Sequence, residues 1–170
     1  DLTEEHIRVI APDVGGAFGG KASIYPEEAM VAYAAYTLQQ PVKWCAARSE
    51  DMLAATHGRG ATSTGQLAFD ATGRALALRA RLAFPLGHWL PYSAFMPARN
   101  GGRILPGPYR IEAVAIDIAA QRSNTAAMNI YRGAGRPEAA MLMERLMDDG
   151  ARRLGLDPIA IRKRNLIAPA

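Results

Sequence analysis

The sequence is poor in cysteine, lysine and aromatic residues, and it has no long uninterrupted apolar run. Its single cysteine, Cys45, excludes disulfides within the chain, cysteine-ligated zinc and any iron–sulfur cluster held by this chain alone. Arg or Asp interrupts every long apolar stretch before it reaches the roughly 20 residues that a membrane span needs. Aromatic residues do not interleave with basic ones, as they do in many nucleic-acid-binding proteins. We therefore expect neither a nucleic-acid partner nor a membrane.

The remaining composition is typical of one soluble globular domain. The 170 residues are 49% hydrophobic and 21% charged, and no linker divides residues 1–170, so we expect a single domain with its own core. The net charge of +4, from 17 Arg and 3 Lys against 16 acids, favours a small anionic ligand over a polyanion. The chain begins at Asp1 without a targeting segment, so we expect it to be excised from a longer, cytoplasmic protein.

Apolar periodicity predicts an α+β fold. Strands are expected at 6–11, 42–47, 61–69, 74–84 and 110–121, with a hairpin turn at 70–73. Helices are expected to begin at Pro26, Ser49, Arg136 and Pro158, with Asp157 as a cap. The helix from Pro26 is apolar on most faces and should be buried, as should Cys45. The expected architecture has two layers, a mixed β-sheet with helices packed mainly on one side.

The segment 85–109 has no periodicity. It holds five prolines and four glycines, and a loop of this length inside a domain is more often functional than idle. The histidines, at positions 6, 57 and 88, have no metal-ligand spacing, and no Ser–His–Asp or Cys–His set can be argued. His57 is expected to be structural, whereas His88 has a possible surface or pocket role. We predict no metal ligand and identify no general base.

A glycine-rich loop follows the first expected strand. Its candidate binding residues are Gly15, Gly16, Ala17, Phe18, Gly19 and Gly20, followed by Lys21. Small residues let backbone N–H groups approach an anion closely. Phe18 must either plug the core or project into a site. Residues 15–21 also satisfy the phosphate-loop pattern Gly-x-x-x-x-Gly-Lys, but Ala22 stands where that loop needs Ser or Thr for magnesium. A plain turn is the remaining alternative.

A second glycine-bearing turn precedes the helix expected from Arg136. Its candidate binding residues are Tyr131, Arg132, Gly133 and Ala134. Arg132 and Arg136 are rigid donors suited to phosphate or to oxygen-rich rings. The alternative is that these arginines simply pair with Glu138 and nearby carbonyl groups. Two such loops suggest two walls that grip one extended anionic cofactor.

Four motifs, in order and at fitting distances, resemble those of one known family. They are Val14–Lys21, then Arg48–Met52, then Tyr131–Glu138, then Asp157-Pro158 with Arg162 and Asn165–Ile167. Together they are similar to the first molybdopterin-binding region of the large subunit of xanthine dehydrogenases, aldehyde oxidases and carbon monoxide dehydrogenases. The resemblance covers nearly the whole chain.

The resemblance implies a molybdenum cofactor held by a pterin dithiolene, in bacteria often as the cytosine dinucleotide. It implies hydroxylation with water, and transfer of electrons to iron–sulfur and FAD groups on partner domains or subunits. By resemblance, residues 16–19 would lie against the metal's oxo face. Tyr131, Arg132 and Gly133 would form the opposing loop, and residues 85–109 would contribute to a substrate funnel. The family's glutamate base would lie outside this chain, so the chain alone should be inactive.

Departures from the family pattern narrow the substrate. Ala22 stands where purine hydroxylases have an acid, and residues 133–136 lack the Cys-Ser-Phe-Arg of the carbon monoxide type. The substrate classes that remain are an aldehyde and an N-heterocycle. The alternative functions are a non-catalytic partner-binding domain and a nucleotide binder of the phosphate-loop kind. An excised chain would also expose an apolar face, through which a homodimer could form.

Overall fold

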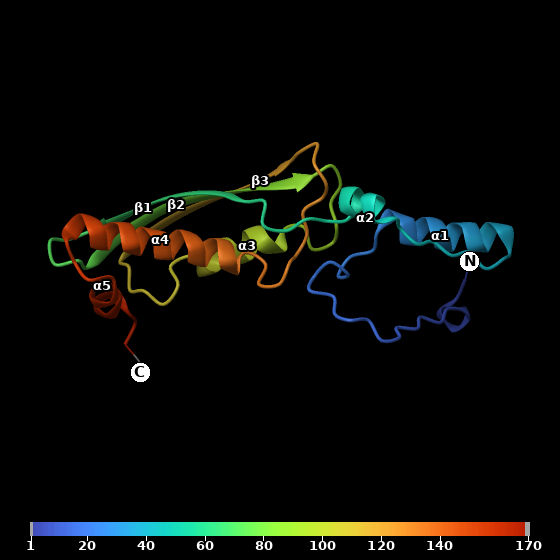
Figure 1. Ribbon diagram of the computed structural model, residues 1–170, viewed down its shortest axis with the longest axis horizontal. Coiled ribbons are helices and arrows are strands. Elements are labelled where there is room, and N and C mark those ends of the chain that lie inside the picture. The colour runs from blue at the N-terminus through green and yellow to red at the C-terminus, as the bar shows by residue number, and fades with distance from the viewer. Residues whose placement is uncertain (1, 169–170) are drawn as a thin grey trace.

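A computed structural model of the chain describes residues 2–168. It has two parts, a sheet covered by helices and an arm that projects from one end of it (Figure 1). The elements, in order, are η1 (Glu4–His6), α1 (Pro26–Leu38), α2 (Arg48–Ala54), β1 (Thr62–Phe69), β2 (Ala75–Gly87), α3 (Met96–Ile104), β3 (Ala113–Arg122), α4 (Arg136–Leu154) and α5 (Pro158–Asn165). Among these residues, no helix is long and apolar enough to cross a membrane.

The three strands form one mixed sheet in the order β1-β2-β3. β1 and β2 are antiparallel, and β2 and β3 are parallel. The expected hairpin is confirmed, with a turn held by Asp70, whose carboxylate accepts bonds from the Thr72 and Arg74 backbone N–H groups at 2.8 and 2.9 Å. A hydrogen bond from the Thr72 hydroxyl, together with these backbone bonds, holds the pKa of the Asp70 carboxyl below its usual value.

The core lies on one face of β2. Leu78, Leu82 and Phe84 are each at most 2% exposed, and they alternate with the exposed Arg79 and Arg81. α3 and α4 cover that face, as Figure 1 shows, and their side chains join the strand residues in one apolar cluster. The predicted two-layer α+β arrangement, with helices on one side of a mixed sheet, is therefore confirmed.

Two predicted strands do not form. Residues 6–11 and 42–47 are extended but unpaired, apart from His6 in η1. A strand needs a neighbour to accept its backbone hydrogen bonds, and no segment of residues 2–168 supplies one here. Cys45 is exposed rather than buried. The second helix begins at Arg48 without a serine cap, because the Glu50 carboxylate instead accepts from the Ala47 N–H at 2.7 Å.

The segment 85–109 is not a plain loop. β2 continues to Gly87, and α3 occupies Met96–Ile104. The helix escaped prediction because its sequence contains Pro97 and two glycines. Pro97 stands in the first turn, where a helix has no hydrogen bond for its nitrogen to make. The glycines let α3 approach its neighbours closely, and Gly101 packs against Phe84 of the sheet.

The arm, defined here as residues 2–56, lacks a core of its own. Of its side chains, Ser23 alone is buried, and α1 has none, contrary to the burial expected for that helix. Met30, Tyr33 and Leu38 of α1 are each more than 60% exposed. The described fold accordingly leaves much surface open: the accessible area is 11911 Å², against roughly 8,100 Å² for a compact monomer of this mass.

The cap of α5 carries a prediction. The Asp157 carboxylate accepts a hydrogen bond from the Ala160 N–H at 2.7 Å, as the sequence indicated. Asp157→Ala removes this bond and is expected to weaken α5 by about 1 kcal/mol, which corresponds to about fivefold faster amide exchange over residues 158–165. Hydrogen-exchange mass spectrometry measures this directly. Unchanged exchange in α5 would contradict the role of Asp157 as a cap.

Candidate cofactor-binding site

The two glycine-bearing loops predicted from the sequence lie side by side. We call residues 15–21 the glycine loop and residues 130–135 the arginine loop. The Arg132 N–H donates to the Phe18 carbonyl at 2.9 Å, which joins the two loops directly. At Gly19, where φ is +103°, a Cβ atom would lie 2.4 Å from the Ile130 carbonyl oxygen. The loops therefore meet with no room for a side chain at this position.

A hollow of about 350 Å³ lies where the loops meet, and residues from both loops line it: Phe18, Gly19, Ile130, Tyr131, Arg132, Gly133 and Ala134. Phe18 is 54% exposed, so it projects from the loop rather than plugging the core. The Arg132 guanidinium carbon stands 5.9 Å from the centre of the Phe18 ring. The hollow thus brings Phe18 and Gly19 together with the four candidate residues of the arginine loop, whereas Ala17 and Gly20 line a second hollow.

The glycine loop presents backbone donors. Within residues 2–168, the N–H groups of residues 16–19 have no protein acceptor. The Lys21 ammonium donates to the Gly16 carbonyl at 3.0 Å and adds positive charge beside them. These features suit an anionic ligand rich in acceptor atoms. They do not reproduce a phosphate loop, because α1 begins only at Pro26 and its N-terminus does not continue directly from Lys21.

Three buried polar side chains support the loops through a hydrogen-bond network. Asn129, which is 1% exposed, accepts from the Ser93 hydroxyl and from the Ile130 N–H through its Oδ1, the latter at 2.8 Å. Its Nδ2 donates to the Ser23 hydroxyl at 3.3 Å. The network joins the segment after the glycine loop, the segment before α3 and the start of the arginine loop. Ser23 and Ser93 were not predicted from the sequence, because isolated serines form no recognisable motif.

Arg59 also supports the arginine loop. Its guanidinium donates to the Arg132 carbonyl, and Nη1 stands 3.5 Å from Oε1 of Glu138 in the first turn of α4. Arg136 instead donates to the Gly133 carbonyl at 3.4 Å. Among the described residues, Glu138 therefore pairs with Arg59 rather than with Arg132 or Arg136, whereas Arg136 does pair with a nearby carbonyl group, as the alternative expected. Arg59 lies far from both motifs in sequence, and no local signal marks it.

Within the arm, Tyr25 connects the glycine loop to the residue at the end of the arm, Thr56. The Tyr25 hydroxyl donates to the Gly20 carbonyl at 2.8 Å and lies 2.8 Å from the Thr56 hydroxyl oxygen. The second hollow, of about 460 Å³, lies between the glycine loop and later residues of the arm, and it is lined in part by Lys21 and Trp44. Within residues 2–168, no three His, Cys, Asp or Glu side chains are grouped so that they could hold a metal ion.

Comparison with known proteins gives consistent relatives. A family model described as "Molybdopterin cofactor-binding domain" matches residues 1–166. The chain is 34% identical to the nicotine 6-hydroxylase large subunit of Paenarthrobacter nicotinovorans, over 96% of this chain and 20% of the relative. It is 32% identical to the gamma subunit of the 6-hydroxypseudooxynicotine dehydrogenase complex of the same organism, over 98% of this chain and 21% of the relative.

A solved structure agrees with these relatives. Quinoline 2-oxidoreductase from Pseudomonas putida 86 superposes with a TM-score of 0.87 and 38% identity, over 93% of this chain and 20% of that chain. The chain thus spans about a fifth of the length of the proteins it matches. It belongs to the molybdopterin cofactor-binding domain family, as part of the group that contains the large subunits of xanthine dehydrogenases, aldehyde oxidases and carbon monoxide dehydrogenases.

Proposed function

We propose that the glycine loop and the arginine loop bind the pterin dithiolene of a molybdenum cofactor between them. The observation that carries the proposal is the hollow lined by residues of both loops, which the hydrogen bond from the Arg132 N–H to the Phe18 carbonyl joins directly. When bound, the cofactor supplies hydroxylation of an electron-poor carbon with an oxygen atom from water.

The residues of the hollow fit such a ligand. The open N–H groups of residues 16–19 would donate to acceptor atoms on the metal side of the cofactor. Tyr131, Arg132 and Gly133 would contact the pterin from the opposite side. The guanidinium of Arg132, held over the Phe18 ring, adds a cation that compensates the charge of an anionic ligand.

The substrate class that we propose is an N-heteroaromatic compound. Two relatives carry nicotine and quinoline in their names. Ala22 and residues 133–136 already disfavour a purine and carbon monoxide, and the expectation left an aldehyde or an N-heterocycle. The names of these relatives favour the N-heterocycle. The glutamate base would come from outside this chain, so residues 1–170 alone would be inactive.

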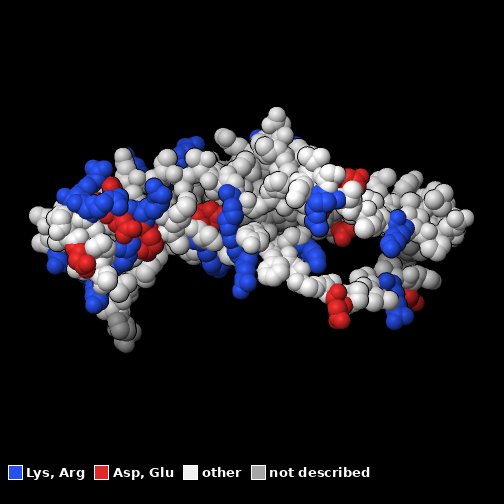
Figure 2. Space-filling model, viewed as in Figure 1, with Lys and Arg blue, Asp and Glu red and all other residues white. Residues whose placement is uncertain are grey.

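The exposed arm supports a larger assembly. The accessible area of the chain exceeds that of a compact monomer by roughly 3,800 Å², and this excess is larger than a standard protein–protein interface, which buries about 1,600 Å². Figure 2 shows charges crowded at the end that holds α4 and α5 and few on the far part of the arm, where α1 lies. We propose that the remainder of a cytoplasmic large subunit covers the arm, and that iron–sulfur and FAD partners complete the path for electrons.

The test is made on the full-length protein purified from its source. We expect about one molybdenum and one pterin per chain, release of cytidine monophosphate on acid hydrolysis, and turnover of quinoline or nicotine in preference to aldehydes. Cofactor present with aldehyde turnover alone would contradict the proposed substrate class. A protein without molybdenum and pterin would contradict the proposed function and favour the partner-binding alternative. The mass in solution of residues 1–170 alone tests the homodimer expected of the excised chain.

A further inference from the structure

The Arg59 guanidinium contacts three groups, two in the arginine loop and one in the helix that follows it. Arg59 donates to the Arg132 carbonyl. Its guanidinium carbon stands 4.7 Å from the centre of the Tyr131 ring, in a cation–π contact. Its Nη1 stands 3.5 Å from Glu138 Oε1. The arginine loop is thus held by a residue 73 positions away from Arg132 in sequence.

The negative charge of the Glu138 carboxylate has little compensation apart from Arg59. The Glu138 side chain is 8% exposed, and within residues 2–168 its Oε2 atom is buried without a hydrogen-bond partner. A buried carboxylate needs a nearby cation, because an unpaired charge in the interior is costly. Arg59 supplies that cation, so its guanidinium is drawn toward the start of α4 and, with it, toward the arginine loop.

The backbone around Arg59 is shaped to make this contact. Arg59 itself has φ of +62°, a left-handed conformation that non-glycine residues adopt rarely and at a cost. At the preceding residue, Gly58, a Cβ atom would lie 2.6 Å from Cβ of Tyr131. The chain therefore passes directly against Tyr131, and it does so in a conformation that only the surrounding contacts maintain.

We propose that Arg59 is a positioning residue of the cofactor site. Its planar fork holds the Arg132 carbonyl and the Tyr131 ring together, and so it sets where these two residues face the hollow. The inference rests on the proposed function, in which Tyr131 and Arg132 contact the cofactor. Lysine would keep the charge beside Glu138 but lacks both the fork and the flat face that stacks on an aromatic ring.

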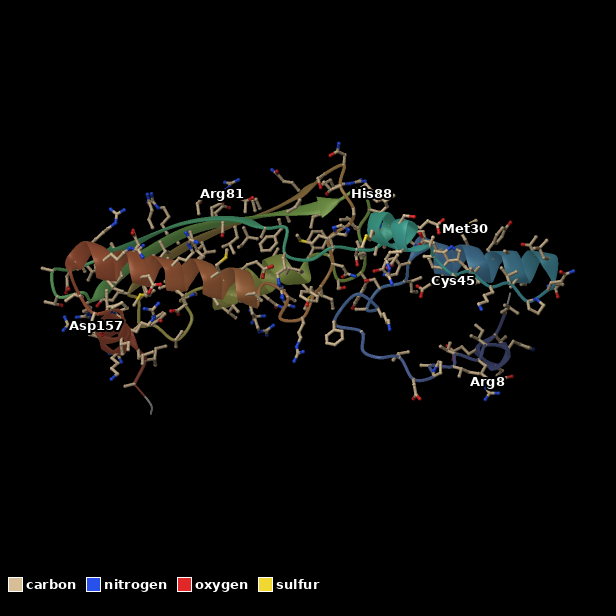
Figure 3. All side chains as sticks on the ribbon, viewed as in Figure 1. Arg8, Met30, Cys45, Arg81, His88 and Asp157 are labelled. Carbon is tan, nitrogen blue, oxygen red and sulfur yellow. The ribbon has the colours of Figure 1, made fainter. Side chains whose placement is uncertain are left out.

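The test separates positioning from charge pairing with three variants of the full-length protein. Arg59→Lys keeps the cation and removes the fork. The double variant Arg59→Met with Glu138→Gln removes both charges, so no unpaired carboxylate remains buried. Arg81→Lys is the matched control, because Arg81 pairs with Asp117 at 2.7 Å on the outer face of the sheet, away from α4 (Figure 3). Molybdenum and pterin per chain are measured after extended dialysis, and hydrogen exchange is followed at the Arg132 amide and across α4.

We expect Arg59→Lys to lose cofactor about ten- to a hundredfold faster than wild type, as is typical when the outer support of a metal site is removed. The Arg132 amide should exchange faster while α4 exchanges as before. The double variant should keep α4 intact and still lose cofactor, and Arg81→Lys should match wild type.

Two results would overturn the proposal. One is cofactor retention in Arg59→Lys equal to wild type. The other is recovery of retention in the double variant together with a stable α4, since Arg59 would then serve only to neutralise Glu138. A wild-type protein that carries no cofactor contradicts the proposed function itself, and this is seen before any variant is compared.

Discussion

Gly19→Ala is expected to abolish stable cofactor binding in the full-length protein. The new Cβ would lie 2.4 Å from the Ile130 carbonyl oxygen and 2.8 Å from its carbon, both backbone atoms that cannot move without moving the arginine loop. The φ of +103° adds strain of about 2 kcal/mol for a residue with a side chain. The free loop can relax out of this conformation, and restoring the conformation on binding then costs that strain, which corresponds to about thirtyfold weaker binding.

Separation of the two loops should increase this loss, because the hydrogen bond from the Arg132 N–H to the Phe18 carbonyl would break. Molybdenum and pterin content per chain measure the effect. Gly20→Ala is the comparison, since it adds the same methyl group one residue later, where it reaches only the Ala17 carbonyl oxygen at 3.7 Å. Equal cofactor content in Gly19→Ala and wild type would show that the loops do not hold the cofactor between them.

Asn129→Leu is expected to loosen the support beneath both loops. The change leaves the Ile130 N–H and the hydroxyls of Ser23 and Ser93 without their shared partner in a buried position. Buried polar groups left unpaired cost about 1–3 kcal/mol each. Because the two hydroxyls can still bond to each other across 3.3 Å, we expect a total of about 3 kcal/mol, which corresponds to more than about a hundredfold in local opening.

The Ile130 amide reports this loss directly, since it donates to Asn129 Oδ1 at 2.8 Å. Its hydrogen exchange should accelerate by about two orders of magnitude. Ser23→Ala serves as the matched control, because it removes only the 3.3 Å bond from Asn129 Nδ2 and the contact with Ser93. It should accelerate the Ile130 exchange by less than tenfold, on the basis of about 1 kcal/mol for one hydrogen bond. If both variants exchanged alike, Asn129 would not be the centre of the network.

The elements predicted well are those whose contacts are local. The hairpin of β1 and β2 was readable because strict alternation places Leu78 and Leu82 on one face and because Asp70 and Gly73 suit its turn. α4 was readable because its apolar residues recur at helical spacing after a proline and end at Gly155, which closes the helix with φ of +66°. In each case the residues that form the element also stabilise it.

The wrong predictions share one cause: each depended on a partner segment elsewhere, which a local sequence pattern does not identify. Residues 6–11 and 42–47 have strand-like patterns, but a strand forms only where another supplies its hydrogen bonds. α1 and Cys45 are apolar, yet both lie on the exposed arm, where Figure 3 labels Cys45 and Met30 of α1. An apolar pattern indicates that a residue prefers burial, but not that this stretch of chain contains its cover.

The candidate residues of the two loops could be recognised from the sequence, because glycines and arginines in those orders limit what the backbone and the charges can do. That the loops meet, and that Arg59, Ser23 and Ser93 support them, became visible only in the folded chain. These contacts join positions 73 to 114 residues apart, or 36 in the case of Ser93 with Asn129. Periodicity along a helix or strand indicates which of its faces prefers burial. The partner that a side chain meets across the fold depends on how the whole chain packs.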